Sequence, residues 1–432
     1  MPSPMRFVLA VTFLAGAAGA QVHLPSLPLP AGPLQSLPRL EDQLDQRVSV
    51  PLGELHHVEV ERLIRDNRTL IDKDPNGSPI VRREILVLSP ADAVEEHARA
   101  MGFEIVREQR IGSMNLQVAV FKAPAGLSTQ KALLTLREAD PAGVYEYNHI
   151  YLGGGALQGS RASQGRAGSS EQEQTSPGQE SAAHFRVRVG LLDTGIDLSH
   201  PVFRQSAVHT WGCGQHAFPA PHGTAVASLL MGRSDTFRGV QPDAELYAAD
   251  VYCGAPTGGA VDALVAALGW LVQEKVPVIN ISLVGPKNTL LEHVIAALID
   301  NGFLIVAAVG NDGPAAPPLY PASYARVVGV TAVDARRRVL IEAAQGPQVM
   351  FAAAGADMRA AGADHSYTAV RGTSFAAPIV AALLAVRLSS PDTAAAAAAL
   401  DALVQSAIDL GPPGKDLTYG YGMVGADYRP RP

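Results

Sequence analysis

The pattern of apolar and polar positions is most regular between Glu84 and Leu152. Short apolar runs and amphipathic stretches predict the order strand, helix, strand, strand, helix, strand, with Ser128 as the cap of the second helix. This is the order of the ferredoxin-like α+β fold. Just before this region, residues 55–72 carry apolar positions near helical spacing, which predicts a short amphipathic helix.

From residue 184 to 432 the pattern changes to alternating strands and helices. Strands such as "FLIVAAVG" (303–310) are apolar throughout, as expected when both faces of a sheet are covered. The region is therefore predicted to form a doubly wound, mostly parallel α/β sheet. In such sheets functional groups gather at the carboxyl ends of the strands.

The remaining segments lack a period. Residues 153–183 are dominated by Gly, Ser, Gln and Ala without an aromatic residue, which predicts a flexible linker. Residues 21–83 are predicted to be an extension, poorly ordered except for the short helix. Residues 1–20 combine Arg6, an apolar run and the small residues "AGA", which is typical of a secretory signal peptide and predicts export.

Composition narrows the function classes. The chain has 432 residues, of which 47% are hydrophobic and 17% charged, and its formal charge of −7 without any basic run argues against nucleic acid as a partner. No segment after the signal peptide reaches the roughly 20 apolar residues that span a bilayer. In an exported protein the only two cysteines, Cys213 and Cys253, are expected to form a disulfide. Two independent free thiols are the alternative.

Three short segments carry candidate chemistry: "GLLDTGID" with Asp193, "HGTAVAS" with His222 and "GTSFAAP" with Ser374. Taken singly, each residue has a structural interpretation, as a turn residue, a helix-end histidine and a helix cap. Together they place an acid, a base and a nucleophile at the ends of elements of one sheet. The chain order Asp, His, Ser is one of the known orders of a hydrolytic triad.

With these motifs, the region from 187 to 425 resembles the subtilisin-like serine proteases. "IVAAVGNDGP" places Asn311 just past a buried strand, where the family carries its oxyanion-hole asparagine, and "YPASY" and "YGYGMVGA" resemble further family segments. The resemblance implies a serine endopeptidase with Asp193, His222 and Ser374 as its triad. Asn311 and the Ser374 backbone N–H would form the oxyanion hole, and Thr373 would be left to cap the helix.

The resemblance also implies which segments bind substrate. "SLVG" and "APTGG" would flank the peptide as extended strands and pair with its backbone. The candidate substrate-binding residues are Ser282, Leu283, Val284, Gly285, Pro256, Thr257, Gly258 and Ala308. Val284 stands where the family has glycine, which predicts a restricted pocket for the residue before the scissile bond. The chemistry requires no cofactor; structural calcium is common in the family, but no Asp-rich run places a site.

Secreted members of the family often carry a ferredoxin-like prosegment that assists folding and then inhibits. Residues 84–152 resemble one, and "VYEYNHIYLGG" resembles the strand and tail that a prosegment lays into the substrate cleft. The expected partners are therefore peptide or protein substrates and the chain's own prosegment, in the periplasm or outside the cell, with maturation cuts in the exposed linker. Two alternatives stay open: a catalytically silent or prosegment-locked relative that acts as a binding module, and an intracellular peptidase, which the signal peptide and the cysteine pair oppose.

Overall fold

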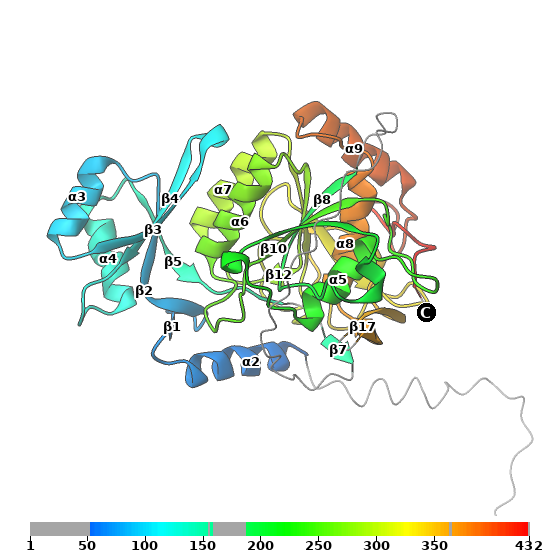
Figure 1. Cartoon of the computed structure of the whole chain (residues 1–432), viewed down its shortest axis with the longest axis horizontal. Helices are drawn as coiled ribbons and strands as arrows, with labels where there is room; N and C mark the ends of the chain where they lie inside the picture. The colour runs from blue at the N-terminus through cyan, green and yellow to red at the C-terminus, as the bar shows by residue number, and fades with distance from the viewer. Residues whose placement is uncertain (1–51, 154–155, 159–186, 363–364, 431–432) are drawn as a thin grey trace, which may run out of the picture. The chain divides into compact units, whose positions relative to one another are not determined.

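A seven-stranded sheet forms the centre of the C-terminal part of the chain (Figure 1). The structure is a computed structural model that describes residues 52–153, 156–158, 187–362 and 365–430, all within one compact unit, residues 50–432. All neighbouring strands of this sheet run parallel. In sheet order they are β15 (Val349–Ala354), β14 (Val328–Val333), β13 (Leu304–Ala308), β11 (Val278–Ile281), β8 (Arg188–Asp193), β10 (Glu245–Asp250) and β9 (Ala207–Trp211).

Helices cover both faces of this sheet. We call the sheet together with these helices the large domain. One face carries α5 (Pro221–Met231), α8 (Thr373–Ala385) and α9 (Thr393–Ser406), and the other carries α6 (Val261–Gln273) and α7 (Thr289–Asp300). Along β8, Val189 and Leu191 pack in the first cluster and Leu192 in the second, as the two-residue period of a strand requires. The predicted doubly wound, mostly parallel fold is confirmed.

The N-terminal part forms a smaller, antiparallel sheet. We call this sheet together with its helices the small domain. Its elements are β1 (Ile71–Lys73), β2 (Pro79–Leu88), α3 (Asp92–Ala100), β3 (Glu104–Ile111), β4 (Leu116–Lys122), α4 (Thr129–Ala139) and β5 (Val144–His149). The main strands lie in the order β5, β2, β4, β3, which is that of the predicted ferredoxin-like fold. Ser128 caps α4 as predicted, since its hydroxyl accepts a hydrogen bond from the Lys131 N–H.

The two faces of the small sheet have different partners. One packs on α3 and α4 through a cluster of its own. The other contributes Leu86, Val118 and Val120 to the hydrophobic cluster that also contains α6 and α7. Helices α6 and α7 are therefore buried between the two sheets, and burial of apolar surface holds the two domains together.

The helix before the small domain differs from the prediction. It is α2 (Leu52–Asp66), and it ends six residues before the predicted end at residue 72. The Asn67 side chain donates to the Leu63 carbonyl at 3.0 Å where the helix ends, and Ile71 already pairs with Val81 in β1. Ordered strand also starts at Pro79, ahead of the predicted boundary at residue 84.

The predicted linker is wrong in its first residues. Gly153 belongs to β6 (Leu152–Gly153), which pairs antiparallel with β12 (Leu283–Val284). Residues Ala156–Gln158 form β7, which pairs with β17 (Tyr367–Arg371), and β17 pairs in turn with β16 (Met358–Ala361). The remainder of the linker, the predicted signal peptide and the extension before residue 52 lie outside the described residues.

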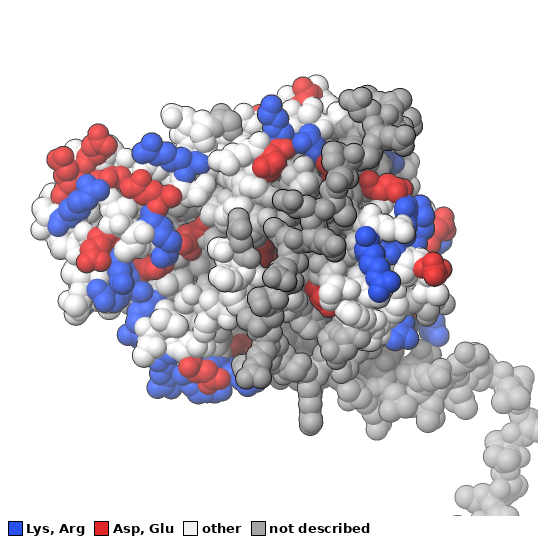
Figure 2. Space-filling model, in the orientation of Figure 1, with Lys and Arg blue, Asp and Glu red and all other residues white. Residues whose placement is uncertain are grey.

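The surface of the described residues shows charges of both signs. On the face drawn in Figure 2, acidic and basic side chains are mixed over the small domain. Within the ranges the structure describes, no helix has the length and apolar character needed to cross a membrane.

Candidate active site

Asp193 and His222 meet where β8 ends and α5 begins. Asp193 is the last residue of β8 and is completely buried, and His222 is the second residue of α5. The His222 Nδ1–H donates to Asp193 Oδ1 at 2.7 Å, and the Thr194 N–H donates to the same oxygen at 2.7 Å. The carboxylate thus fixes both the orientation and the tautomer of the imidazole.

The glycine after His222 permits this approach. A Cβ on Gly223 would lie 2.2 Å from the Thr194 carbonyl oxygen, so any other residue would push α5 away from the end of β8. The Gly223 N–H also donates to the Thr194 hydroxyl at 2.9 Å. The "DTG" and "HG" segments are therefore complementary halves of one contact.

The environment of His222 raises its pKa. Burial alone would lower the pKa because it penalises the imidazolium. The charge and hydrogen bond of Asp193, together with the more distant charge of Glu59 on α2, outweigh burial and leave the pKa above its ordinary value. Such a histidine is suited to accept a proton and hold it.

Ser374 lies in the first turn of α8 and is completely buried. Its hydroxyl donates to the Ser282 carbonyl at 3.2 Å, and the Ser282 hydroxyl donates to the Ser374 carbonyl at 3.0 Å. The next residue, Phe375, brings its ring centroid to 5.5 Å from that of His222. Among the described residues His222 Nε2 has no hydrogen-bond partner, so the serine–histidine hydrogen bond is not formed in this structure.

Asn311 follows β13 and faces the start of α8. Its Oδ1 accepts a hydrogen bond from the Thr373 N–H at 3.0 Å, which leaves Nδ2 buried and without a partner among the described residues. Buried donors are seldom left unpaired, so this amide is a candidate oxyanion donor. The predicted capping role of Thr373 is wrong: Gly372 precedes the helix, and the Thr373 hydroxyl accepts from the Gly310 N–H at 3.2 Å instead.

The strand that the sequence assigned to substrate binding is already paired. The segment that follows β5, residues 150–153, we call the tail; its Leu152 pairs with Val284 and its Gly153 with Leu283. A Cβ built on Gly153 would lie 3.7 Å from three atoms of the His222 ring. The chain's own tail therefore runs along β12 as an extended peptide and ends beside the histidine.

The second predicted substrate strand is shifted. Residues 255–258 form turns, in which the Ala255 N–H donates to the Tyr252 carbonyl and the Gly258 N–H to the Ala255 carbonyl. Only the last glycine of the predicted segment pairs with the tail: the Tyr151 N–H donates to the Gly259 carbonyl at 2.8 Å. Pro256, Thr257 and Gly258 were therefore wrongly placed as an extended strand, because the Pro-Thr-Gly-Gly run closes a turn.

Tyr151 anchors the tail, and sequence reasoning missed it. Its ring is fully buried, its hydroxyl donates to the Pro286 carbonyl at 2.7 Å, and its own carbonyl accepts from the Tyr252 hydroxyl at 2.7 Å. A Cβ on Gly285 would come within 2.7 Å of the Tyr151 ring, so this glycine makes room for it. An aromatic residue two positions before a glycine run was the available indication.

The other predicted substrate residues are buried. Ser282 is hydrogen-bonded to Ser374 as described. Ala308 is the last residue of β13 and lies in the hydrophobic cluster that also contains α5 and α8. Val284 is 2% exposed next to Leu152. The restricted pocket expected from Val284 stays a prediction.

Cys213 and Cys253 form the predicted disulfide, with a Cα–Cα distance of 5.1 Å. Both sulfurs lie 3.6 Å from the carbonyl oxygen of Asp250, the last residue of β10. Asp250 is paired with Asp193 across the sheet, so the bridge lies one strand away from the predicted triad acid.

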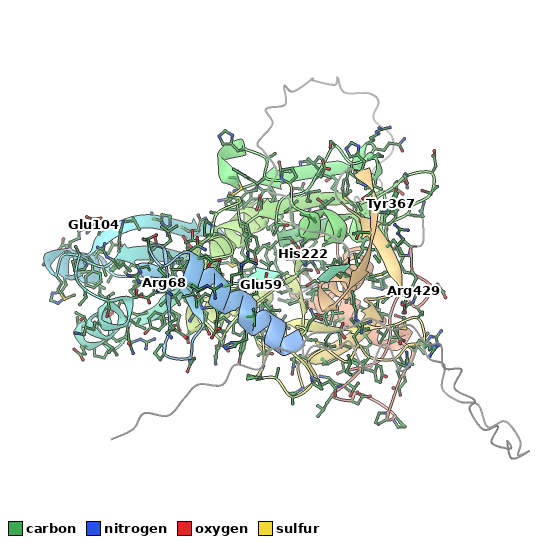
Figure 3. All side chains as sticks on the ribbon, turned by 90° about the horizontal axis from the view of Figure 1, so that it is seen from below. Glu59, Arg68, Glu104, His222, Tyr367 and Arg429 are labelled. Atoms are coloured by element: carbon green, nitrogen blue, oxygen red, sulfur yellow. A yellow bond between two sulfur atoms is a disulfide. The ribbon has the colours of Figure 1, made fainter. Side chains whose placement is uncertain are left out.

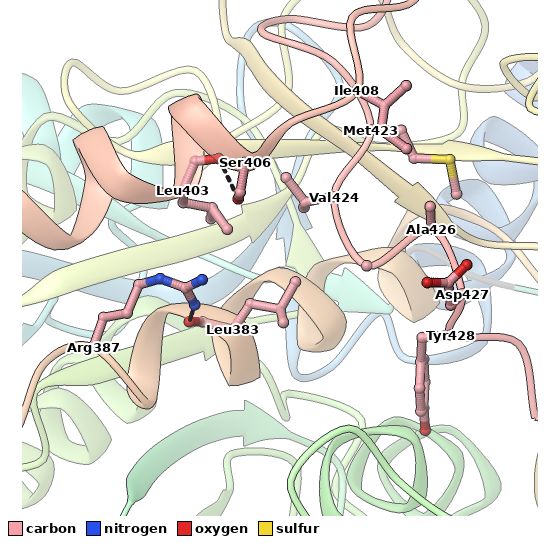
Figure 4. Close-up of a pocket in the computed structure, with 11 residues that line it drawn as sticks. Leu383, Arg387, Leu403, Ser406, Ile408, Met423, Val424, Ala426, Asp427 and Tyr428 are labelled. Atoms are coloured by element: carbon pink, nitrogen blue, oxygen red, sulfur yellow. Dashed lines mark hydrogen bonds between the residues drawn. The ribbon is translucent and has the colours of Figure 1, made fainter.

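Two other features of the large domain do not contribute to this site. The described residues offer one cluster with metal-ligand spacing, Cys213, Asp250 and Cys253, but its sulfurs are bonded to each other. A cavity of about 450 Å³ is lined by residues that include Leu383, Leu403 and Tyr428 (Figure 4). It lies at the far end of α8, about 14 Å along the helix from Ser374 at 1.5 Å per residue.

Known proteins with similar sequences belong to one family. Residues 186–422 match the subtilase family. Subtilisin DY of Bacillus licheniformis is 31% identical over 249 residues, which are 56% of this chain and 89% of that protein. The minor extracellular protease Epr of Bacillus subtilis (strain 168) is 30% identical over 246 residues, 55% of this chain and 37% of that protein.

A solved structure shows the same fold. Fervidolysin from Fervidobacterium pennivorans, a keratinolytic enzyme related to subtilisin, superimposes with a TM-score of 0.65 at 19% identity, over 82% of this chain and 62% of that one. The likeness in fold therefore extends beyond the residues that match the family. Because the family match covers more than half of the chain, the chain belongs to the subtilase family and is a serine endopeptidase.

Proposed function

We propose that the chain is an exported endopeptidase that cleaves peptide bonds with Asp193, His222 and Ser374 and is made as a precursor inhibited by its own N-terminal part. The observation that carries the proposal is the position of the tail, which lies antiparallel on β12 with Gly153 against the His222 ring. An extended chain in this position is bound as a substrate would be.

The chemistry follows from the positions of the groups. Ser374 Oγ attacks the carbonyl carbon of the scissile bond while His222 Nε2 takes its proton. The oxyanion that forms is met by Asn311 Nδ2 and by the Ser374 N–H, which has no intrahelical partner in the first turn of α8. His222 returns the proton to the departing amine, and water then hydrolyses the acyl-enzyme by the same route. Asp193 stabilises the imidazolium throughout.

The small domain is bound to the large one by specific polar contacts that suit an inhibitor. The Asn148 side chain donates to the Asp262 carboxylate at 2.9 Å in the first turn of α6. The Glu146 carboxylate accepts from the Thr289 N–H at 3.2 Å in the first turn of α7. The Glu146 carboxylate is favourable at the N-terminus of α7, and the Asn148 amide oxygen accepts from the Asp262 N–H in the first turn of α6, so β5 complements both helices.

Helix α2 adds a second layer to this inhibition. Leu63 and Ile64 of α2 pack on the cluster of Ile71, Ile150 and Ala260, which includes the first residue of the tail. Figure 3 shows α2 crossing the molecule, and Glu59 on this helix is the more distant charge that contributes to the raised pKa of His222. We propose that α2 holds the tail in the cleft.

Self-cleavage is proposed between residues 153 and 156. The tail ends at Gly153 beside His222, and the described chain resumes in β7, where Ala156 pairs with Arg371. Arg371 is three residues before Ser374. We therefore propose that the cut falls between these two paired strands, the described segments on either side of it. Export is proposed from residues 1–20 and from the likeness to an extracellular protease.

Labelling with a fluorophosphonate tests the proposal. The full-length protein, incubated until processing is complete, should react at Ser374, identified by peptide mapping, and His222→Ala should abolish the reaction. A folded protein that hydrolyses no peptide and takes up no label would show instead a catalytically silent subtilase.

A further inference from the structure

An ion pair between a buried carboxylate and a partly exposed arginine lies beside the proposed oxyanion hole. Glu342, in the loop between β14 and β15, has a side chain that is only 3% exposed. Both of its carboxylate oxygens are bound by Arg371 at the end of β17: Nε lies 2.6 Å from Oε1 and Nη2 lies 2.9 Å from Oε2. A bidentate pair of this kind fixes geometry as well as charge.

The backbone of the Glu342 loop holds the segment that carries Asn311. The Gly313 N–H donates to the Glu342 carbonyl at 2.8 Å, and the Ala344 N–H donates to the Gly310 carbonyl at 3.0 Å. Asn311 lies between these two attachment points. Its position is therefore set by the Glu342 loop on one side.

The start of α8 holds the same segment on the other side. The Thr373 N–H donates to Asn311 Oδ1, and the Gly310 N–H donates to the Thr373 hydroxyl. Thr373 is two residues after Arg371. The contacts form a closed ring, from Arg371 to Glu342, from there to the Asn311 segment, and back through Thr373 to Arg371.

We propose that Arg371 and Glu342 are positioning residues that hold Asn311 Nδ2 in register with the Ser374 N–H; this rests on the oxyanion role proposed above for Asn311. Without the ion pair, two loops that belong to different parts of the sequence are joined only by hydrogen bonds around the oxyanion site. Preorganised donors lose their effect when they move, and a misplacement of about 1 Å can cost about 100-fold in rate. Neither side chain touches the substrate in this role.

The test compares kcat and KM of the processed enzyme on a peptide amide. Glu342→Gln keeps the shape and removes the charge, and Arg371→Lys keeps the charge and removes the fork. Both should lower kcat by about tenfold or more and leave KM within about twofold. Asp300→Asn is the matched control, because it breaks an exposed ion pair with Arg326 away from the site, and its kcat should be unchanged.

A double-mutant cycle with Asn311→Ala decides between positioning and general stability. If the pair acts through Asn311, Glu342→Gln should cost almost nothing in the Asn311→Ala background. An equal cost in both backgrounds, a change confined to KM, or no change would overturn the proposal; a change in KM alone would make Arg371 a substrate contact. If Glu342→Gln does not fold, the same cycle is run with Arg371→Lys. Hydrolysis by the unchanged enzyme tests the proposed function separately.

Discussion

Asn311 and Thr373 are joined by a hydrogen bond from the Thr373 N–H to Asn311 Oδ1 at 3.0 Å, and this bond occupies the oxygen end of the amide. Nδ2 is left as a buried donor without a partner among the described residues, and we propose that it faces the substrate carbonyl attacked by Ser374. Asn311→Ala should therefore lower kcat by about 100- to 1,000-fold, a magnitude measured in subtilisin itself, a relative of this chain. KM should change little, because the donor acts on the transition state. Steady-state kinetics check this, and a loss mainly in KM would contradict the role.

The pKa of His222 should lie above its ordinary value of about 6.5 in the inhibited precursor. Burial lowers the pKa, but Asp193 and, after it, Glu59 raise the pKa by more than burial lowers it. NMR titration of the His222 ring in the uncut Ser374→Ala precursor measures it. Glu59→Gln should lower the value, whereas Glu61→Gln, which removes a neighbouring charge paired with His57, should not.

The same shift has a consequence for stability. A folded-state pKa above the unfolded one means that the protonated histidine stabilises the fold at pH below the unfolded pKa, and that this contribution is lost as pH rises through the folded pKa. A His222 pKa below the ordinary value would show that burial outweighs Asp193 and would contradict the assignment.

Removal of the Cys213–Cys253 bridge should destabilise the protein by about 4 kcal/mol on the chain-entropy model, since the bridge closes a loop with a sequence separation of 40. Chemical denaturation of the double variant Cys213→Ser/Cys253→Ser measures the free energy of unfolding. The proximity of the bridge to Asp250 and Asp193 predicts a lower kcat as well. A loss of stability below about 1 kcal/mol would show that the bridge contributes little.

Weakening α2 should speed the appearance of activity. Leu63→Asp or Ile64→Asp places a charge in the apolar contact with the tail, and a loss of about 1–2 kcal/mol there would raise tail release about 5- to 30-fold. The lag before hydrolysis of a reporter peptide measures this. Val58→Asp on the same helix is the control, because Val58 is 59% exposed. Equal lags in all three variants would show that α2 does not restrain the tail.

The sequence predicts those parts of the site that depend on local patterns. Asp193 could be placed because an apolar strand ends at it, and His222 and Ser374 because each begins a helix of small and apolar residues. The parallel sheet followed from strands with two apolar faces. These features need only the residues next to each other in the chain.

Features that depend on contacts between distant segments could not be predicted from the sequence. Strand β7 lies in a Gly- and Ser-rich stretch without apolar alternation, and it exists because its backbone pairs with β17. The pair of Glu342 and Arg371 is separated by many residues and has no local motif. Pro256 and Thr257 were predicted to lie in an extended strand, but they form a turn, because Pro and Gly residues in this run favour turns.

The most direct test of the central claim, that Ser374 is the nucleophile of a self-processing endopeptidase, is the fate of the Ser374→Ala precursor. The unchanged chain should cut itself between residues 153 and 156, and mass spectrometry should find the new N-terminus there. The variant loses one buried oxygen, should fold normally, and should remain intact over the same period with no peptide hydrolysis. Normal self-processing of the folded Ser374→Ala protein would contradict the account.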